Sequence, residues 1–267
     1  MRLAVIGIGL MGGSLALTLK RNGFVSNVIG VDNNTKHQAE ALELGLVDEI
    51  MSLEDAVRLS DIIAIATPVN IAEKLLPTIL DLVDQQVVFD VGSTKESIVN
   101  IANSHSKKGR FVPTHPMWGT EFSGPSAAQQ DAFLEKATVI CNSDKVDTDA
   151  LQKVEALYKA LGMHIVNMDA MKHDIHVAYV SHISHITSFA LANTVLEKEK
   201  ESDAIFELAS GGFESTVRLA KSNAAMWVPI FMQNKENVLD VLNEHISQLK
   251  KFKACLCLLY TSDAADE

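Results

Sequence analysis

Residues 3–13 read Leu-Ala-Val-Ile-Gly-Ile-Gly-Leu-Met-Gly-Gly, a short apolar run that ends in closely spaced glycines. The apolar part predicts a buried strand, and residues 14–21 predict a helix that begins directly after the glycines. Three of these glycines form the pattern Gly7-x-Gly9-x-x-Gly12. A strand, a glycine-rich turn and a helix in this order are typical of a dinucleotide-binding unit, so we expect such a unit at the start of the chain.

An acidic residue supports this interpretation. A second short strand, expected at 28–31, ends at Asp32, 20 residues after Gly12. A carboxylate here can accept hydrogen bonds from ribose hydroxyls and repels a 2′-phosphate, so the sequence predicts NAD rather than NADP. A glycine-rich turn that binds another ligand, such as an S-adenosyl cofactor, stays open as an alternative. The expected cofactor site comprises Gly7, Gly9, Leu10, Met11, Gly12, Asp32, Thr67 and Pro68.

Strand and helix patterns then alternate as far as about residue 167. Further strands are expected at 62–66, 87–91, 111–113, 137–141 and 164–167, and helices at 35–44, 53–59, 71–83, 93–106 and 149–161. Apolar strands separated by helices indicate an α/β fold, a Rossmann-type doubly wound parallel sheet over 1–167. Three long helical patterns follow at roughly 170–198, 202–221 and 224–253, which predict an all-helical C-terminal domain over 168–253.

The last residues do not fit this pattern. Residues 255–267 read CLCLLYTSDAADE and follow an amphipathic helical stretch with no stop signal. They resemble translated sequencing-library adapter, so we expect natural sequence to end near Lys253 and 254–267 to be a non-native tail. A short natural tail is the alternative.

Composition restricts the class of protein. The formal net charge is −11, from 34 acidic and 23 basic residues, which disfavours a nucleic-acid or membrane-surface partner. Three cysteines are too few and too sparse for a disulfide framework. No apolar run reaches the ~20 residues of a membrane span, and no signal peptide is evident, so a cytoplasmic protein is expected.

Two candidate catalytic residues follow expected strands. His115 comes after the strand at 111–113, at the carboxyl end where ligands bind in open parallel sheets. A histidine there can accept a proton near neutral pH, although a structural histidine in a proline-containing turn is the alternative. Ser93 follows the strand at 87–91, and its spacing to Glu96 also matches a helix capping box.

Histidines crowd the first helix of the C-terminal domain. His182 and His185 share one helical face with Ser181 nearby, and His173 and His176 precede them. A zinc site is the rival interpretation, but no cysteine accompanies them, so no metal site is expected. In a later helix, a partly buried Arg218 is expected to bind a substrate carboxylate or to pair with Glu214 at i−4.

Together these motifs resemble those of prephenate dehydrogenases. They are the glycine pattern, Gly-Ser-Thr-Lys at 92–95, His-Pro-Met-x-Gly-x-Glu at 115–121, Ser-His-x-x-His at 181–185, and Gly-Gly-Phe at 211–213 followed by Arg218. The resemblance implies NAD-dependent oxidative decarboxylation of prephenate to 4-hydroxyphenylpyruvate in tyrosine biosynthesis, by a homodimer joined through its helical domain. It also implies catalytic roles for His115 and Ser93. The substrate residues it implies are Ser181, His182, His185, Arg218, Trp227 and Glu121.

One departure and three alternatives remain. The family often has an aspartate three residues before the arginine, where this chain has Ser215. Arogenate dehydrogenase is the nearest rival activity. A β-hydroxyacid dehydrogenase is less consistent, because Lys172 is followed one turn later by His176 rather than by an amide residue. A non-catalytic NAD-binding regulator is the third alternative.

Overall fold

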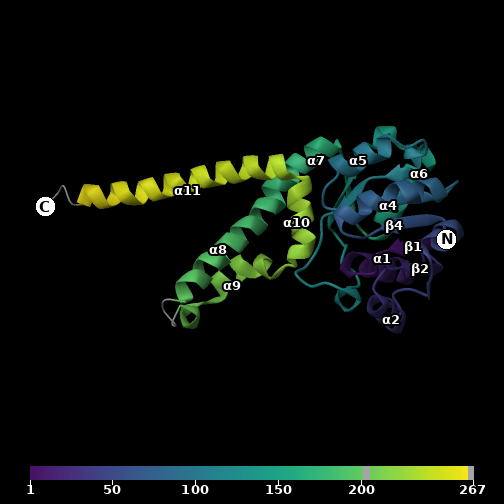
Figure 1. The fold of residues 1–267 in the computed structure, drawn as a ribbon, viewed down its shortest axis with the longest axis horizontal. Helices are drawn as coiled ribbons and strands as arrows, with labels where there is room; N and C mark the ends of the chain where they lie inside the picture. The colour runs from purple at the N-terminus through teal and green to yellow at the C-terminus, as the bar shows by residue number, and fades with distance from the viewer. Residues whose placement is uncertain (201–204, 264–267) are drawn as a thin grey trace. The chain divides into compact units, whose positions relative to one another are not determined.

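A computed structural model describes residues 1–200 and 205–263 of the chain (Figure 1). Its contacts divide the chain into two compact units. The first unit comprises residues 1–174 and 221–233, and the second comprises 175–220 and the residues from 234 onward. Residues 168–174 and 221–233, which the sequence pattern assigned to the helical domain, therefore group with the first unit.

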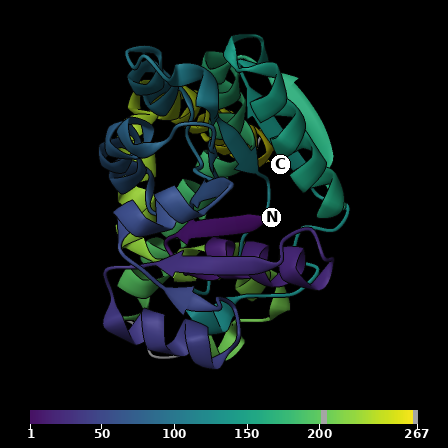
Figure 2. The ribbon, with the colours of Figure 1, turned by 90° about the vertical axis from the view of Figure 1, so that its right-hand side faces the viewer.

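A six-stranded sheet forms the centre of the first unit. Its strand order is β3-β2-β1-β4-β5-β6, and every neighbouring pair is parallel. Figure 2 shows β1 and β2 side by side in purple. The strands are β1 (Arg2–Ile6), β2 (Asn27–Val31), β3 (Glu49–Ile50), β4 (Ile62–Ile65), β5 (Val87–Asp90) and β6 (Phe111–Val112). The expected doubly wound parallel sheet is confirmed, and the two-residue β3 is an addition to it.

Helices cover both faces of this sheet. Alternate residues of β1 point to opposite faces. Leu3 and Val5 pack with side chains from α1 and α6, whereas Ala4 and Ile6 pack with side chains from α3, α4 and α5. The helices of this part are α1 (Leu10–Arg21), α2 (Thr35–Glu43), α3 (Leu53–Leu59), α4 (Val69–Leu82), α5 (Glu96–Asn103) and α6 (Thr148–Ala160). Short 3₁₀ turns occupy Lys108–Arg110, Pro125–Ala127 and Ser143–Lys145.

A second, three-stranded sheet holds the strands that follow. It has the order β7-β8-β9 and consists of β7 (Thr114–Pro116), β8 (Ala137–Cys141) and β9 (His164–Met168). β7 is antiparallel to β8, and β9 is parallel to it. The sequence predicted β8 and β9 as strands but not their separate sheet. Pro113 has no N–H to offer the first sheet, and its carbonyl instead accepts a hydrogen bond from Cys141 N at 2.9 Å.

The helical part differs from its prediction in three places, at each of the three expected helices. The helix expected at 170–198 is present as α7 (Ala170–Val177), a π-helical turn η4 (Ala178–His182) and α8 (Ile183–Glu199). The single helix expected at 202–221 is wrong, because 205–221 hold η5 (Phe206–Leu208), α9 (Gly211–Val217) and η6 (Arg218–Lys221). Residues 201–204 lie outside the described residues. Two adjacent glycines, Gly211 and Gly212, start α9 and disfavour a longer helix through this point.

The helix expected at 224–253 is also divided. It consists of α10 (Ala224–Gln233) and α11 (Lys235–Asp263), which meet at the buried Asn234. Asparagine favours helix starts, and the Asn234 carbonyl accepts a hydrogen bond from Val238 N at 2.9 Å. α11 continues through residues 254–263, so the proposed non-native tail stays a prediction. Within 1–200 and 205–263, no helix has both the length and the apolar character needed to cross a membrane.

Candidate functional site

The glycine turn between β1 and α1 has the geometry that its spacing predicts. Gly7 has a φ of +95°, and a Cβ there would lie 2.7 Å from Ala66 O, so a side chain cannot be accommodated. A Cβ on Gly12 would lie 2.1 Å from Gly7 O, which confirms that this glycine permits close packing of helix on strand. At Gly9, by contrast, a Cβ would meet nothing within 4 Å. The backbone at Gly9 therefore borders open space.

The N-terminus of α1 lies at this open position. Gly9 is the N-cap, no side chain caps the helix, and its first turn contains no acidic residue. The first N–H groups of the helix and its dipole therefore favour a negatively charged ligand. The turn also lies against residues 66–67, because a Cβ added to Gly7 would be 3.0 Å from Thr67 N. Thr67 and the N-cap of α4, Pro68, thus belong to the same edge of the sheet.

Asp32 lies beside the glycine turn, as expected from its position after β2. One carboxylate oxygen accepts a hydrogen bond from Ile8 N at 3.0 Å, and the other accepts one from Asn34 N at 2.9 Å. His37 Nδ1 is 3.7 Å from the oxygen that Ile8 contacts. These bonds hold the carboxylate at the end of β2, in register with the turn after β1.

His115 lies in β7, opposite Val139 of β8. It is thus a strand residue of the second sheet, rather than a loop residue at the end of the first. Its Nδ1 is 2.8 Å from His173 Nε2, and His173 Nδ1 is 2.7 Å from an oxygen of Asp174. The fractional exposures of His115, His173 and Asp174 are 9%, 0% and 2%. The structure therefore connects the predicted catalytic histidine to a buried His–Asp pair that sequence reasoning did not assign to the site.

A buried polar network supports the strand that carries His115. The carboxylate of Asp90 pairs with the ammonium of Lys95 and accepts hydrogen bonds from Gly92 N at 2.9 Å and Thr114 N at 3.1 Å. The Thr114 hydroxyl in turn contacts the hydroxyl of Tyr158. Asp90, Lys95, Thr114 and Tyr158 are each 1% exposed or less. Because Thr114 directly precedes His115, this network fixes the backbone at the candidate catalytic residue.

Ser93 does not have the capping role that its spacing suggested. It lies half-buried in the bend between β5 and α5, and α5 begins at Glu96 with Lys95 as its N-cap and no side-chain bond from that residue. The capping-box prediction is wrong, because a residue distant in sequence takes that place. The Asp174 carboxylate accepts hydrogen bonds from Lys95 N at 2.8 Å and Glu96 N at 2.9 Å.

The second unit contains four of the predicted substrate residues. Ser181 and His182 lie in the π-helical turn η4, and His185 lies one turn further along in α8. His182 is buried, and its Nδ1 is 3.2 Å from the side-chain nitrogen of Asn234. His185 Nδ1 is 3.1 Å from Ser181 O. These are the contacts of hydrogen-bonded histidines, and no group of three His, Cys, Asp or Glu residues within the described ranges is arranged to hold a metal ion.

Arg218 is the fourth of these residues, and one part of its prediction is wrong. It begins η6 and is exposed rather than partly buried. Burial lowers the pKa of His185, the hydrogen bond to Ser181 O opposes that shift, and the positive charge of Arg218 lowers the pKa further. Both causes favour the neutral form of His185, and the second of them is the charge of Arg218.

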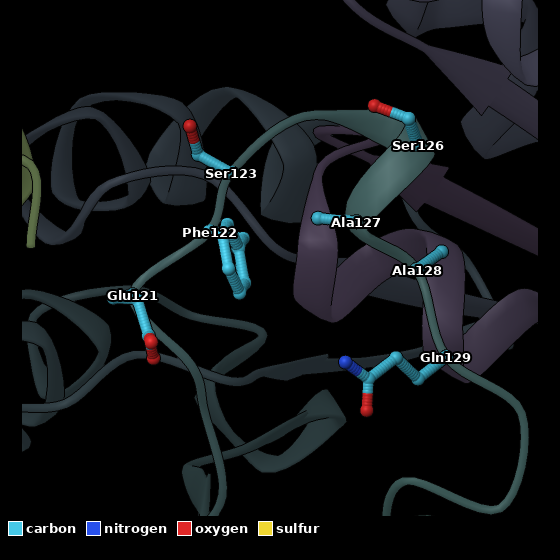
Figure 3. Close-up of a pocket in the computed structure, with 7 residues that line it drawn as sticks. All are labelled: Glu121, Phe122, Ser123, Ser126, Ala127, Ala128 and Gln129. Atoms are coloured by element: carbon cyan, nitrogen blue, oxygen red, sulfur yellow. The ribbon is translucent and has the colours of Figure 1, made fainter.

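The other two predicted substrate residues lie in the first unit. Trp227 of α10 is buried with Val69 and Ile230, and its ring centre is 5.3 Å from that of Phe231. Glu121 borders a pocket of about 510 Å³, shown in Figure 3. All the residues lining it come from one loop: Glu121, Phe122, Ser123, Ser126, Ala127, Ala128 and Gln129. Gln129 N donates to Ser14 Oγ at 2.8 Å, which ties this loop to the first turns of α1.

Comparison with protein families identifies both parts of the chain. Residues 15–167 match the family model described as prephenate dehydrogenase, nucleotide-binding domain. Residues 169–264 match the one described as prephenate dehydrogenase, dimerization domain. The glycine turn at 7–12 precedes the first match, so its assignment rests on the geometry given above.

Individual proteins agree with these matches. A prephenate dehydrogenase of Bacillus subtilis (strain 168) is 32% identical over 251 residues, which are 92% of this chain and 68% of the relative. The structure of prephenate dehydrogenase from A. aeolicus in complex with hydroxyphenyl propionate and NAD+ is 29% identical. It has a TM-score of 0.87 over 95% of this chain and 90% of its own. Synechocystis arogenate dehydrogenase is 28% identical, with a TM-score of 0.73 over 94% of this chain and 90% of its own.

The two family models together match residues 15–167 and 169–264. The chain that they match contains the parallel sheet with its glycine turn, the buried histidine of β7 and the helical part. A curated relative at 32% identity agrees with them. The chain belongs to the prephenate dehydrogenase family of oxidoreductases, which includes arogenate and cyclohexadienyl dehydrogenases.

Proposed function

We propose that this chain catalyses the NAD-dependent oxidative decarboxylation of prephenate to 4-hydroxyphenylpyruvate, a step of tyrosine biosynthesis. Family membership supports a dehydrogenase of this class. The observation that carries the proposal is the buried His115. Its ring is fixed by a hydrogen bond to a second buried histidine, and the strand that carries His115 is supported by a polar network. A proton acceptor held in one orientation is what removal of the ring 4-hydroxyl proton requires.

The residues at the glycine turn fit NAD. The open space at Gly9 and the uncapped N-terminus of α1 suit a diphosphate, and Asp32 is held beside the turn where it can accept from ribose hydroxyls. The similar structure from A. aeolicus is a complex with NAD+, which supports the same cofactor here. NAD, when bound, supplies the acceptor for the hydride that leaves C4 of the substrate ring.

The chain's own residues then have separate roles. His115 accepts a hydrogen bond from the 4-hydroxyl and takes its proton as the carbonyl forms at C4. Ser93 contacts the same hydroxyl and orients it toward the imidazole. Arg218 binds a substrate carboxylate through paired N–H donors, which positions C4 for the reaction. Loss of carbon dioxide makes the ring aromatic, so the protein need not activate the carboxylate strongly.

The remaining predicted residues complete the substrate site in this proposal. Ser181, His182 and His185 supply hydrogen-bonding groups from η4 and α8, Trp227 supplies an apolar surface, and Glu121 borders the entrance.

Arogenate is the second candidate substrate. It differs from prephenate only in the amino group of its side chain. The similarity to Synechocystis arogenate dehydrogenase favours keeping it as an alternative. Steady-state measurement of kcat/KM for prephenate and arogenate, each with NAD and with NADP, distinguishes the two activities.

The histidine variant His115→Asn tests the proposal directly. It should lower kcat by roughly 10²-fold or more, because a general base contributes about 10²–10⁴. NAD affinity, measured by quenching of tryptophan fluorescence, should stay within about twofold. His164→Asn is the matched control, because His164 is an exposed histidine of β9 in the same sheet. A near-normal kcat in His115→Asn would show that His115 is only structural.

We also propose that the chain forms a homodimer through its second unit. Six apolar residues would supply the shared surface, and none of them is fully buried within one copy: Phe189, Val195, Phe206, Leu219, Phe231 and Leu239. Five of these belong to the second unit, whereas Phe231 belongs to the first. The match to a family model described as a dimerization domain supports the same assembly.

A further inference from the structure

A buried chain of hydrogen bonds links His115 to a carboxylate. His115 Nδ1 is 2.8 Å from His173 Nε2, and His173 Nδ1 is 2.7 Å from Asp174 Oδ1. All three residues belong to the first unit, His115 on β7 and the other two on α7. The two histidine rings are tilted edge to face, with an interplanar angle of 72°. Each ring nitrogen in this chain must be either a donor or an acceptor, so the protonation of one ring determines that of the next.

Asp174, at the end of this series of hydrogen bonds, determines which group donates in each of them. Asp174 Oδ1 accepts a hydrogen bond from Lys95 N at 2.8 Å, and Oδ2 accepts one from Glu96 N at 2.9 Å. Both N–H groups belong to the N-terminus of α5, where the helix dipole favours negative charge. A protonated carboxyl would direct its O–H toward one of these donors or toward His173. An ionised carboxylate accepts from all three, so Asp174 is an acceptor toward His173.

The tautomers of both histidines follow from this. His173 carries its proton on Nδ1 and donates it to Asp174, so its Nε2 has a lone pair. That lone pair can only accept, so His115 carries its proton on Nδ1 and has no proton on Nε2. Nε2 is then the atom of His115 that can take a proton from a substrate.

We infer that His173 and Asp174 are positioning residues, which fix His115 in the tautomer whose Nε2 acts as the base. This inference rests on the proposed role of His115. It also explains how the protein favours the charged form of His115 during the reaction. The imidazolium keeps its Nδ1–H bond to His173, and the carboxylate of Asp174 lies at the end of the same chain. In the Ser-His-Asp triad, an aspartate bonded directly to the catalytic imidazole contributes about 10⁴ to kcat. Here His173 lies between Asp174 and His115, so we expect a smaller contribution.

The wild-type protein provides the first test, because tautomers can be observed without substrate. In a chain labelled with ¹⁵N-histidine, His115 should show a protonated Nδ1 and an unprotonated Nε2 at neutral pH. His115→Asn and His173→Gln assign the signals among the nine histidines of the chain. A His115 ring protonated on Nε2 would overturn the inference, whatever the activity of the enzyme.

Asp174→Asn is the second test. Asp174 Oδ1 accepts from both Lys95 N and His173, and Oδ2 accepts from Glu96 N, so the NH₂ group of Asn must replace one of these oxygens. Where it replaces Oδ1, it is placed to donate to His173 Nδ1. His173 would donate from Nε2, and His115 would carry its proton on the nitrogen that should be the base. A reversed His115 tautomer identifies this orientation, and with it we expect kcat for prephenate to fall by roughly 10²-fold or more and KM to change by less than about threefold.

A control variant and a pair of His173 variants distinguish the loss of positioning from a general effect of the substitution. Asp169→Asn is the matched control, because Asp169 is an exposed aspartate just before α7 that accepts from Met171 N at 2.9 Å, and asparagine can accept there too. If Asp174→Asn does not fold, His173→Gln and His173→Leu replace it. Glutamine can still accept from His115 Nδ1, so it should retain at least tenfold more kcat than leucine.

Equal kcat values in the two His173 variants, or a normal kcat in a folded Asp174→Asn protein whose His115 tautomer is reversed, would overturn the inference. If the wild-type tautomer is as expected but His115→Asn keeps its kcat, the proposed function fails and the tautomer assignment stands.

Discussion

The buried ion pair beneath His115 should be essential for the stability of the first unit. The ammonium of Lys95 contacts the carboxylate of Asp90, and the two side chains are 0% and 1% exposed. Substitution Lys95→Met keeps the length of the side chain and removes its charge. The carboxyl group of Asp90 would then be buried without its cation.

The size of the stability loss in Lys95→Met depends on the contacts that Asp90 keeps. Removing one partner of a buried pair typically costs about 3–5 kcal/mol. Here the carboxylate keeps two N–H donors, Gly92 N at 2.9 Å and Thr114 N at 3.1 Å, which compensate for part of the lost charge. We therefore expect a loss near the lower end, about 3 kcal/mol in the free energy of unfolding.

Urea unfolding followed by tryptophan fluorescence measures this loss. Both tryptophans, Trp118 and Trp227, belong to the first unit, so the signal reports its unfolding. Lys159→Met is the control, because Lys159 is an exposed lysine of α6 whose Nζ lies 3.8 Å from a carboxylate oxygen of Glu155. It should change the unfolding free energy by less than about 0.5 kcal/mol.

A double variant tests whether the loss comes from the pair itself. Lys95→Met combined with Asp90→Asn should be more stable than the sum of the single losses predicts, by about 1–3 kcal/mol. A Lys95→Met protein as stable as the control, or strictly additive losses, would refute the reasoning.

Three further outcomes test the proposed site and assembly. Because Asp32 carries a charge beside the glycine turn, kcat/KM should be higher with NAD than with NADP, and equal or better use of NADP would contradict the assignment. Arg218→Ala should raise KM for prephenate far more than it lowers kcat, whereas an unchanged KM would support an ion pair with Glu214 instead. Sedimentation should show a dimer, and a stable monomer with full activity would exclude the shared helical surface.

The periodic parts of the fold could be predicted from the sequence. Strand β4 is a continuous apolar run and β1 is one after Arg2, and helix α4 buries residues at the 3.6-residue spacing. The structural roles of Gly7 and Gly12 could also be predicted, because a tight turn and close backbone packing each require a residue without a side chain.

Contacts between distant residues could not be predicted in this way. Ser93 and Glu96 have the spacing of a capping box, yet Asp174, 78 residues after Glu96, accepts the N–H groups at the start of α5. A carboxylate supplied by another helix competes successfully with a local serine, and spacing along the chain carries no information about it. The nearest signal was the adjacent pair His173-Asp174, which the sequence shows only as part of a histidine-rich segment.

The ionisation of His185 gives a last prediction, which concerns pH. Burial lowers its pKa below the ordinary value of 6.5, the bond to Ser181 O opposes the shift, and the charge of Arg218 adds to it. Because the unfolded chain binds this proton more readily, the contribution of His185 to folding stability is present above pH 6.5 and decreases as the pH falls below it.

NMR titration of labelled His185 measures this pKa directly. It should lie below 6.5 in the wild type and rise only partly in Arg218→Ala, since burial is the larger cause. Arg218→Lys keeps the charge and should leave the pKa nearly unchanged. The 3.1 Å bond to a carbonyl requires a proton on Nδ1, so neutral His185 has its acceptor on Nε2. A wild-type pKa at or above 6.5 would mean that His185 is charged during substrate binding at mildly acidic pH, and that it acts as a second cation beside Arg218 rather than as a neutral hydrogen-bonding group.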